Sequence, residues 1–264
     1  MRVSLSGLLL GVAVTLAAPV LAQTAPAPSA AIKAAIAAPT RTPANTARDV
    51  YRHPAETLAF FGVTPGQTVV EYAPGGGWYS EILTPLTHAK GTFYAAQFPG
   101  KGYDALAKKF AADPATYGKV KLVAWPAQDL IPDGSADTVL TFRNVHNMVM
   151  AGTGEATFQR FFAILKPGGV LGVVDHRLPE DRDSALEKKS GYLKRSTILA
   201  LAKQAGFVLE AESEVNANPK DTADWPDGVW TLPPSYQLGD VDRAKYAAIG
   251  ESDRMTLRFR KPRK

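Results

Sequence analysis

Two short segments of the chain combine histidine with polar neighbours in a way that could move a proton. Asn144 and His146 follow one β-branched run, and Asp175-His176 ends another. In a parallel sheet, polar groups at the carboxyl ends of the strands meet at one edge. A histidine hydrogen-bonded to a carboxylate can act as a general base. The sequence therefore predicts that Asn144, His146, Asp175 and His176 are catalytic residues.

The same four residues admit other interpretations. Each histidine could satisfy backbone groups of its own loop, which is the common role of a polar loop residue. The four could also converge as oxygen and nitrogen ligands of a divalent ion. No His-x-x-x-His or similar local spacing supports that alternative, and we predict no metal site. The chain lacks the Gly-x-Ser-x-Gly elbow of serine hydrolases of the α/β type.

A glycine-rich loop is the second feature with chemical meaning. The run from Thr68 to Tyr72 reads as a strand, and Ala73-Pro74-Gly75-Gly76-Gly77 follows it directly. Glycines let the backbone approach a ligand closely, and the N–H groups at the start of a following helix face that ligand. Alone, such a loop could also be a structural tight turn. Its position after the first predicted strand favours a ligand site.

An alternation of strands and helices positions both features. We predict strands over 68–72, 91–97, 120–125, 136–142, 170–175, 207–215 and 255–260. We predict helices over 78–86, 106–112, 157–165 and 196–205. This order indicates an α/β protein in which a mostly parallel sheet carries helices on both faces.

Over roughly 50–260 the chain resembles the class I S-adenosylmethionine (SAM)-dependent methyltransferases. The likeness includes the acidic residue and glycine loop at 71–77, the Asp-Gly-Ser-x-Asp pattern at 133–137 and the Leu-Lys-Pro-Gly-Gly turn at 165–169. The resemblance implies a Rossmann-like, seven-stranded, mostly parallel sheet. The Asn-Val-His-Asn segment at 144–147 and the Trp-rich tail look like a bacterial family of exported predicted methyltransferases.

The resemblance also implies SAM as the cofactor. Glu71 and the glycines would line its methionine and ribose end, Gln128 and Asp129 would lie near the adenine, and Arg143 would border the sulfonium and the acceptor. The implied cofactor-binding residues are Glu71, Ala73, Pro74, Gly75, Gly76, Gly77, Gln97, Gln128, Asp129 and Arg143.

Two of these residues depart from the family pattern. Ala73 stands where the family has the first glycine of its loop. Gln97 ends the second predicted strand, where these enzymes generally carry an acid that binds both ribose hydroxyls. Glutamine can accept one such hydrogen bond but brings no charge.

The N-terminus predicts export. Arg2 precedes an apolar run over 8–20, and Val20-Leu21-Ala22 offers the small residues that signal peptidase reads. We predict a cleaved signal peptide over 1–22, with an uncleaved membrane anchor as the alternative. A flexible Ala/Pro-rich leader is expected over 23–45, with room for one short helical patch near 31–38, followed by a single domain over 46–264.

Within that domain, 216–250 is long for a connection and carries Trp225 and Trp230, so we expect it to be a lid-like insertion over the site. Trp78 and these two tryptophans could instead be core residues.

The composition limits the cellular compartments and the classes of partner that we expect. The chain contains no cysteine, which excludes disulfides and suits an oxidising compartment. Its 30 Lys and Arg against 25 Asp and Glu give a net charge of +5, part of which lies in the C-terminal segment. No basic face is interleaved with aromatic residues, so we predict no nucleic-acid partner. After signal cleavage we expect no stable membrane insertion. The oligomeric state is left open.

Two functions remain at this point. The first is a periplasmic or secreted SAM-dependent methyltransferase that acts on a small or envelope-associated acceptor. The second is a non-catalytic periplasmic protein that binds a ligand on a repurposed methyltransferase fold. Ala73 and Gln97 favour the second, as does the cytoplasmic origin of SAM, a charged molecule that does not cross membranes freely.

Overall fold

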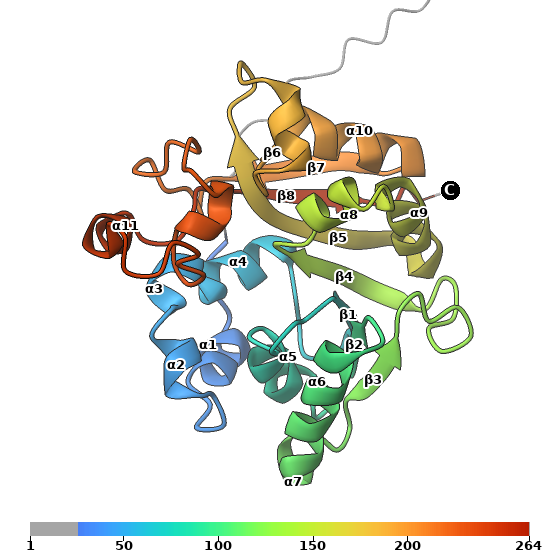
Figure 1. The fold of residues 1–264 in the computed structure, drawn as a ribbon. Coiled ribbons are helices and arrows are strands. Elements are labelled where there is room, and N and C mark those ends of the chain that lie inside the picture. Colours follow the sequence, from blue (N-terminus) through green and yellow to red (C-terminus); the bar gives the residue numbers. More distant parts are fainter. Residues whose placement is uncertain (1–25, 264) are drawn as a thin grey trace, which may run out of the picture.

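A twisted, mostly parallel β-sheet organises the chain, and the computed structural model describes residues 26–263 (Figure 1). The strand order is β3-β2-β1-β4-β5-β8-β7, and the short β6 pairs with the end of β5. Only β8 runs antiparallel to its neighbours β5 and β7 in this part of the chain. The strands are β1 (Thr68–Tyr72), β2 (Thr92–Gln97), β3 (Lys121–Ala124), β4 (Ala136–Phe142), β5 (Leu165–Leu178), β6 (Leu193–Lys194), β7 (Val208–Ser213) and β8 (Arg254–Arg260).

The predicted fold class is confirmed, with one difference in the strand count. All seven predicted strands are present, and β6 makes an eighth. A strand of two residues is too short to show a period in the sequence, which explains why it was not predicted.

Helices cover both faces of the sheet (Figure 1). On one face lie α1 (Ala30–Ile36), α4 (Pro54–Phe61), α5 (Ser80–Thr87), α6 (Lys101–Ala112) and α7 (Pro114–Tyr117). On the other lie α8 (Val145–Met150), α9 (Gly154–Ile164) and α10 (Arg195–Ala205). The remaining helices are α2 (Pro43–Thr46), α3 (Asp49–Arg52), the 3-10 turns η1 (Ser184–Lys188) and η2 (Gly228–Thr231), and α11 (Arg243–Ile249).

The central strands are buried on both sides, because each successive side chain enters a different core. In β1, Val69 packs with the α4 and α5 side, whereas Val70 packs with the α9 and α10 side, and both are fully buried. Such double burial explains why the sequence of β1 shows no strict alternation of apolar and polar residues.

The prediction of a flexible leader over 23–45 is wrong for its described part. Helix α1 packs against α5, with Ile32 and Ala35 buried. Arg41 pairs with Asp49 at 2.6 Å, and Thr42 N–H donates to the Glu81 carboxylate at 3.0 Å. Alanine is the strongest helix former, so an Ala-rich stretch with a single buried isoleucine can fold onto a domain without a long apolar pattern.

The predicted signal peptide over 1–22 lies outside the described residues. Across 26–263, no helix combines the length and the apolar character needed to cross a bilayer.

Candidate active site

A cavity of about 360 Å³ lies at the carboxyl ends of β1 and β4, and we call it the sheet-edge cavity. Eight of the predicted site residues line it. They are Ala73, Pro74, Gly75, Gly76, Arg143, Asn144, His146 and His176. The edge of the sheet therefore brings the glycine loop and both histidines together, as the spacing along the chain predicts.

His146 and Asp175 form a buried pair, with His146 in the cavity wall and Asp175 behind it. The imidazole Nδ1 lies 2.8 Å from Asp175 Oδ1, and the carboxylate is fully buried. Asp175 also accepts hydrogen bonds from the backbone N–H groups of Val145, at 2.6 Å, and His176, at 2.8 Å. A carboxylate with these donors fixes a proton on Nδ1 and leaves Nε2 of His146 as an acceptor. This geometry suits a general base.

His176 is close to this pair but is chemically different. Arg143 Nε donates to His176 Nε2 at 3.2 Å, and the other ring nitrogen contacts the Ser252 hydroxyl. Burial and the positive charge of Arg143 hold the pKa of His176 well below its usual value. The imidazole is therefore neutral with both nitrogens engaged, which favours a role in positioning Arg143. The catalytic role predicted for His176 stays a prediction.

The same geometry bears on the metal alternative. One ligand atom each of His146, Asp175 and His176 lie within 4.8 Å of one another. However, the Asp175 oxygens already accept hydrogen bonds, and an arginine occupies the free side of His176. A cation would have to displace these contacts beside a guanidinium group, which does not fit a metal centre.

Asn144 holds the glycine loop against the end of β4. Its amide nitrogen donates to the carbonyls of Ala73, at 3.1 Å, and Phe142, at 3.1 Å. Ala73 has φ of 49°, the left-handed region that favours glycine. Ala73 thus adopts a backbone conformation that glycine reaches more easily, and the contacts of Asn144 hold the loop in place. The catalytic role predicted for Asn144 stays a prediction.

The glycine loop leaves room for a ligand at two of its three glycines. A Cβ added at Gly75 or Gly76 would meet no atom within 4 Å. A Cβ on Gly77 would instead lie 3.1 Å from the Leu106 side chain of α6, so that glycine serves packing. The open backbone at Gly75 and Gly76 fits a group that must approach the loop closely, as the methionine part of SAM would.

The predicted ribose and adenine residues lie elsewhere. Gln97 is buried outside the cavity, and its side-chain oxygen accepts from Phe98 N–H at 3.0 Å. Its amide nitrogen remains as a donor. Gln128 and Asp129 are exposed on the loop after β3. Contacts of these residues with a nucleoside therefore stay a prediction.

Glu71 lies beneath the loop rather than in the cavity. It is buried, and Ser80 Oγ donates to its carboxylate at 2.6 Å. Burial raises the pKa of Glu71 to about 7, despite the hydrogen bond from Ser80, which lowers it. The native state thus binds a proton between pH 4.5 and 7 that the unfolded chain has released. The stability that this carboxyl contributes is complete below pH 4.5 and is lost as the pH rises through 7.

We therefore expect Glu71→Gln to raise the free energy of unfolding at pH 8 by about 2–3 kcal/mol. The amide oxygen can still accept the hydrogen bond from Ser80, and the neutral side chain carries no burial penalty for charge. Urea unfolding at pH 5 and pH 8 measures the effect, with the exposed Glu56→Gln as the matched control. A loss of stability at pH 8 would contradict this assignment.

Several other cavity residues were not among the predicted catalytic and cofactor-binding residues, and they come from the N-terminal segment, the end of the glycine loop and the 216–250 segment. They are Asn45, Arg48, Arg52, Trp78, Trp230 and Ser235, among others. The indole ring of Trp78 lies under the Arg52 guanidinium, 4.7 Å from its centroid. The expected lid-like segment thus contributes Trp230 and Ser235 to the cavity, and its movement on binding stays a prediction.

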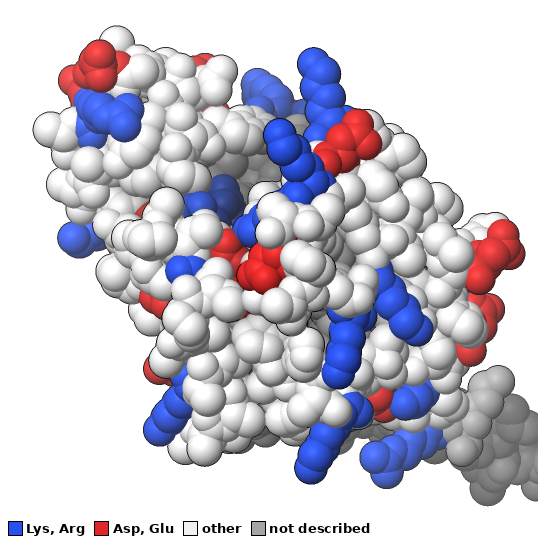
Figure 2. Space-filling model, turned by 90° about the horizontal axis from the view of Figure 1, so that it is seen from below, with Lys and Arg blue, Asp and Glu red and all other residues white. Residues whose placement is uncertain are grey.

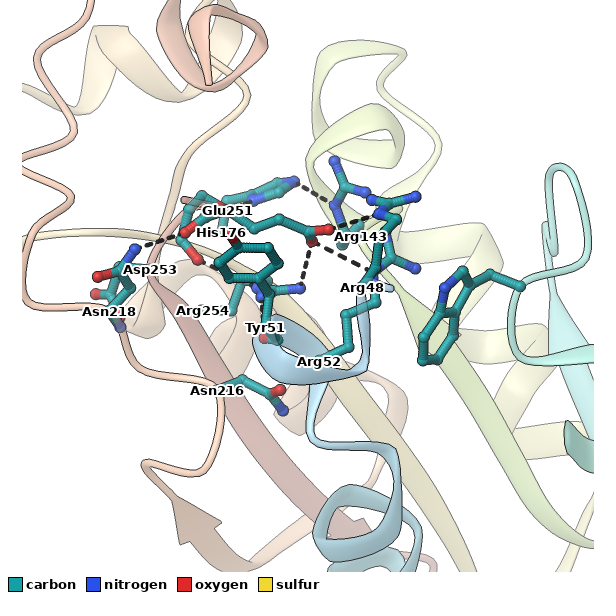
Figure 3. Close-up of polar contacts among 12 residues, drawn as sticks. Arg48, Tyr51, Arg52, Arg143, His176, Asn216, Asn218, Glu251, Asp253 and Arg254 are labelled. Atoms are coloured by element: carbon teal, nitrogen blue, oxygen red, sulfur yellow. Dashed lines mark hydrogen bonds and ion pairs between the residues drawn. The ribbon is translucent and has the colours of Figure 1, made fainter. Parts of the chain in front are cut away.

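Arginines surround a single carboxylate behind the cavity. Glu251 pairs with Arg48 at 2.7 Å, and with Arg52 and Arg254 at 3.2 Å each (Figure 3). Burial would raise the pKa of Glu251, but these guanidinium groups lower it to about 2. Burial lowers the pKa of Arg143, the fourth arginine, to about 9.

A second, larger cavity of about 690 Å³ lies beside the first and shares Trp230 with it. Its other lining residues include Leu186, Trp225 and Gln237. It contains no buried histidine–carboxylate pair, so the sheet-edge cavity is the candidate active site.

Comparison with family models gives no match, and no curated protein matches the sequence. Solved structures do match the fold. A SAM-dependent methyltransferase from Aquifex aeolicus superposes with a TM-score of 0.56 at 16% identity, covering 81% of this chain and 93% of that one. The chain has the fold of the SAM-dependent methyltransferases.

Other solved structures share this fold with similar TM-scores and similar sequence identities. A putative methyltransferase from Bacillus halodurans gives a TM-score of 0.53 at 18% identity, covering 79% of this chain and 98% of that one. The [4+2]-cyclase SpnF gives 0.55 at 16%, covering 84% and 82%. One of these neighbours is thus described as a cyclase, so the fold alone does not determine the reaction.

Proposed function

We propose that this protein is a SAM-dependent methyltransferase that binds its acceptor in the sheet-edge cavity. The observation that carries the proposal is the His146–Asp175 pair, which faces the same cavity as the open backbone of Gly75 and Gly76. A proton acceptor and a close-approach loop are the two parts that methylation of an oxygen or nitrogen needs.

The loop residues Ala73, Gly75 and Gly76 would hold the methionine part of SAM, and Gln97 would reach the ribose with its amide N–H. SAM supplies an electrophilic methyl group when bound. His146 Nε2 accepts the proton that the acceptor O–H or N–H loses, and Asp175 stabilises the resulting imidazolium. His176 and Asn144 keep Arg143 and the loop in place during this step.

The compartment is part of the proposal. An export signal over 1–22 would place the enzyme in the periplasm or outside the cell, in line with the likeness to exported predicted methyltransferases. The acceptor would then be a small or envelope-associated molecule. The alternative is a binding protein that kept the fold without the chemistry, and the engaged side chain of Gln97 favours it.

Titration of the purified protein with SAM and with S-adenosylhomocysteine tests the proposal. We expect binding near 1 μM, about −8 kcal/mol. Gly76→Leu should weaken it at least about tenfold, because the new side chain would occupy the space over the loop.

Gly66→Leu is the matched control, since Gly66 also has open space around it and lies outside the cavity. No binding of either ligand at millimolar concentration would favour the non-catalytic alternative. Equal affinities in both leucine variants would place the cofactor elsewhere.

A further inference from the structure

The wall of the sheet-edge cavity carries more positive charge than the protein neutralises. Arg48, Arg52 and Arg143 line it, and Arg254 lies directly behind. Within the described chain, Glu251 is the one carboxylate that forms ion pairs with this arginine cluster, and it contacts three of its four members. The nearby Asp175 is already paired with His146.

Arg143 is the member of the cluster whose positive charge is least compensated, because it forms no ion pair with Glu251. Its Nε donates to the neutral His176, and among the described residues its two terminal nitrogens have no hydrogen-bond partner (Figure 3). Arg143 is partly buried, and Arg48 Nη2 is buried and also has no partner among the described residues. A buried guanidinium nitrogen without a partner, such as Arg48 Nη2, is costly, because the protein removes water without replacing its hydrogen bonds.

The backbone holds Arg143 in this position at a further cost. Its φ of 61° lies in the left-handed region, which is unfavourable for a side chain of this size. Its N–H donates to Val174 O at 2.7 Å, which ties the turn to β5. A strained residue that directs an unpaired cation into a cavity indicates a ligand that completes the pairing.

We propose that the sheet-edge cavity binds an oxyanion, a carboxylate or phosphate group of the acceptor substrate, through the terminal N–H groups of Arg143 and Arg48. A guanidinium fork donates two parallel hydrogen bonds to either group. The assignment of the oxyanion to a methyl acceptor rests on the proposed function. The binding of an oxyanion to these arginines does not depend on that function.

The position of the proposed base, His146, narrows the chemical class of the ligand further. The rings of His146 and His176 are 5.0 Å apart, and Arg143 contacts His176. Arg143 and His146 line the same cavity, so an oxyanion held by Arg143 shares that cavity with His146. The substrate class that fits is a small acid with a hydroxyl or amino group near its carboxylate or phosphate.

The recessed cluster differs from the rest of the charged surface. On the face shown in Figure 2, many Lys and Arg side chains project outward, and some charged groups lie inside a hollow. Arg52 and Arg254 are 7% and 3% exposed, so bulk ions screen their charge weakly. Selectivity for an anion at this site would therefore persist at moderate salt.

Thermal unfolding and titration calorimetry with inorganic phosphate and with succinate test the site, each against sodium chloride of equal ionic strength. We expect at least one of the two to raise Tm by roughly 5 °C at a hundredfold excess over its Kd. Arg143→Gln should weaken that binding at least about tenfold while leaving the unliganded Tm no lower than that of the wild type. Lys203→Gln, an exposed charge change on α10, should bind as the wild type does.

A second arm separates the acceptor from the cofactor. We expect S-adenosylhomocysteine to bind Arg143→Gln within twofold of the wild type and to bind together with the oxyanion. If Arg143→Gln instead weakens S-adenosylhomocysteine but not 5′-methylthioadenosine, which lacks the amino-acid carboxylate, the arginines serve the cofactor and the proposal is wrong.

The two proposals fail in different ways. No shift with phosphate or succinate beyond chloride would overturn the oxyanion site, whatever the cofactor does. An intact oxyanion response without any binding of S-adenosylhomocysteine would support the site and overturn the methyltransferase function.

Discussion

Replacing Glu251 with glutamine is expected to lower the free energy of unfolding by about 3–5 kcal/mol at pH 7. The carboxylate is 3% exposed and pairs with Arg48, Arg52 and Arg254. Glutamine keeps the size and one acceptor oxygen but removes the negative charge, which leaves three guanidinium groups close together without compensation. Urea unfolding measures the loss.

The acid dependence of stability gives an independent check on Glu251. Its pKa in the folded protein is about 2, below the usual 4.5. The stability that it contributes is therefore complete above pH 4.5 and is lost as the pH falls through about 2. Glu251→Gln should lack this component, so its stability should fall less than that of the wild type between pH 5 and pH 3.

The exposed Glu155→Gln is the matched control for the charge change and should unfold as the wild type does at both pH values. A Glu251→Gln protein within 1 kcal/mol of the wild type at pH 7 would mean that the arginines do not depend on this carboxylate. In that case the excess positive charge at the cavity would be smaller than the ion pairs indicate.

The sheet and half of the site were accessible from the sequence because they depend on local patterns. Buried strands, the glycine loop and the polar residues after β4 and β5 each carry a signal within a few residues. Parallel topology then places His146 and Asp175 side by side, although 29 positions separate them. The roles of His176 and Asn144 depended on their hydrogen-bond partners, and those partners are not visible in spacing.

The arginine cluster could not be predicted, because its partners are far apart in the chain. Arg52 and Glu251 are 199 positions apart and meet only when α3 packs beside the segment before β8. No periodicity connects two such segments. The packing of helix α1 onto the domain was not predicted for a related reason, since this short helix is buried by α4 and α5 and has no long apolar face of its own.

Replacing Asp175 with asparagine is expected to reduce methyl transfer by about 10²–10⁴-fold while leaving SAM affinity within about threefold. Asp175 Oδ1 accepts from His146 Nδ1 and His176 N–H, and Oδ2 accepts from Val145 N–H. Asparagine has only one acceptor oxygen, so its amide N–H₂ must face one of these donor sets. Because position 175 lies outside the sheet-edge cavity, the substitution should change the contacts with a ligand little.

Either orientation of the amide has a distinct consequence. If the N–H₂ group faces His146, it donates to Nδ1, the proton moves to Nε2, and the base is lost. If it faces Val145, the first turn of α8 loses the acceptor of its N–H, and we expect unfolding to become easier by about 1–3 kcal/mol. The exposed Asp104→Asn on α6 is the control for the substitution itself.

Nitrogen-15 NMR of labelled histidine distinguishes the two tautomers directly, and the chain has four histidines to resolve. His146→Gln assigns the relevant signal by its disappearance. We expect an Nδ1-protonated His146 in the wild type and an Nε2-protonated one in Asp175→Asn. An unchanged tautomer together with wild-type turnover would remove Asp175 from the mechanism, and the proton would then need another acceptor. His176 cannot take that role while Arg143 donates to its Nε2, so the pair of His146 and Asp175 carries the proton-transfer step or no residue of this cavity does.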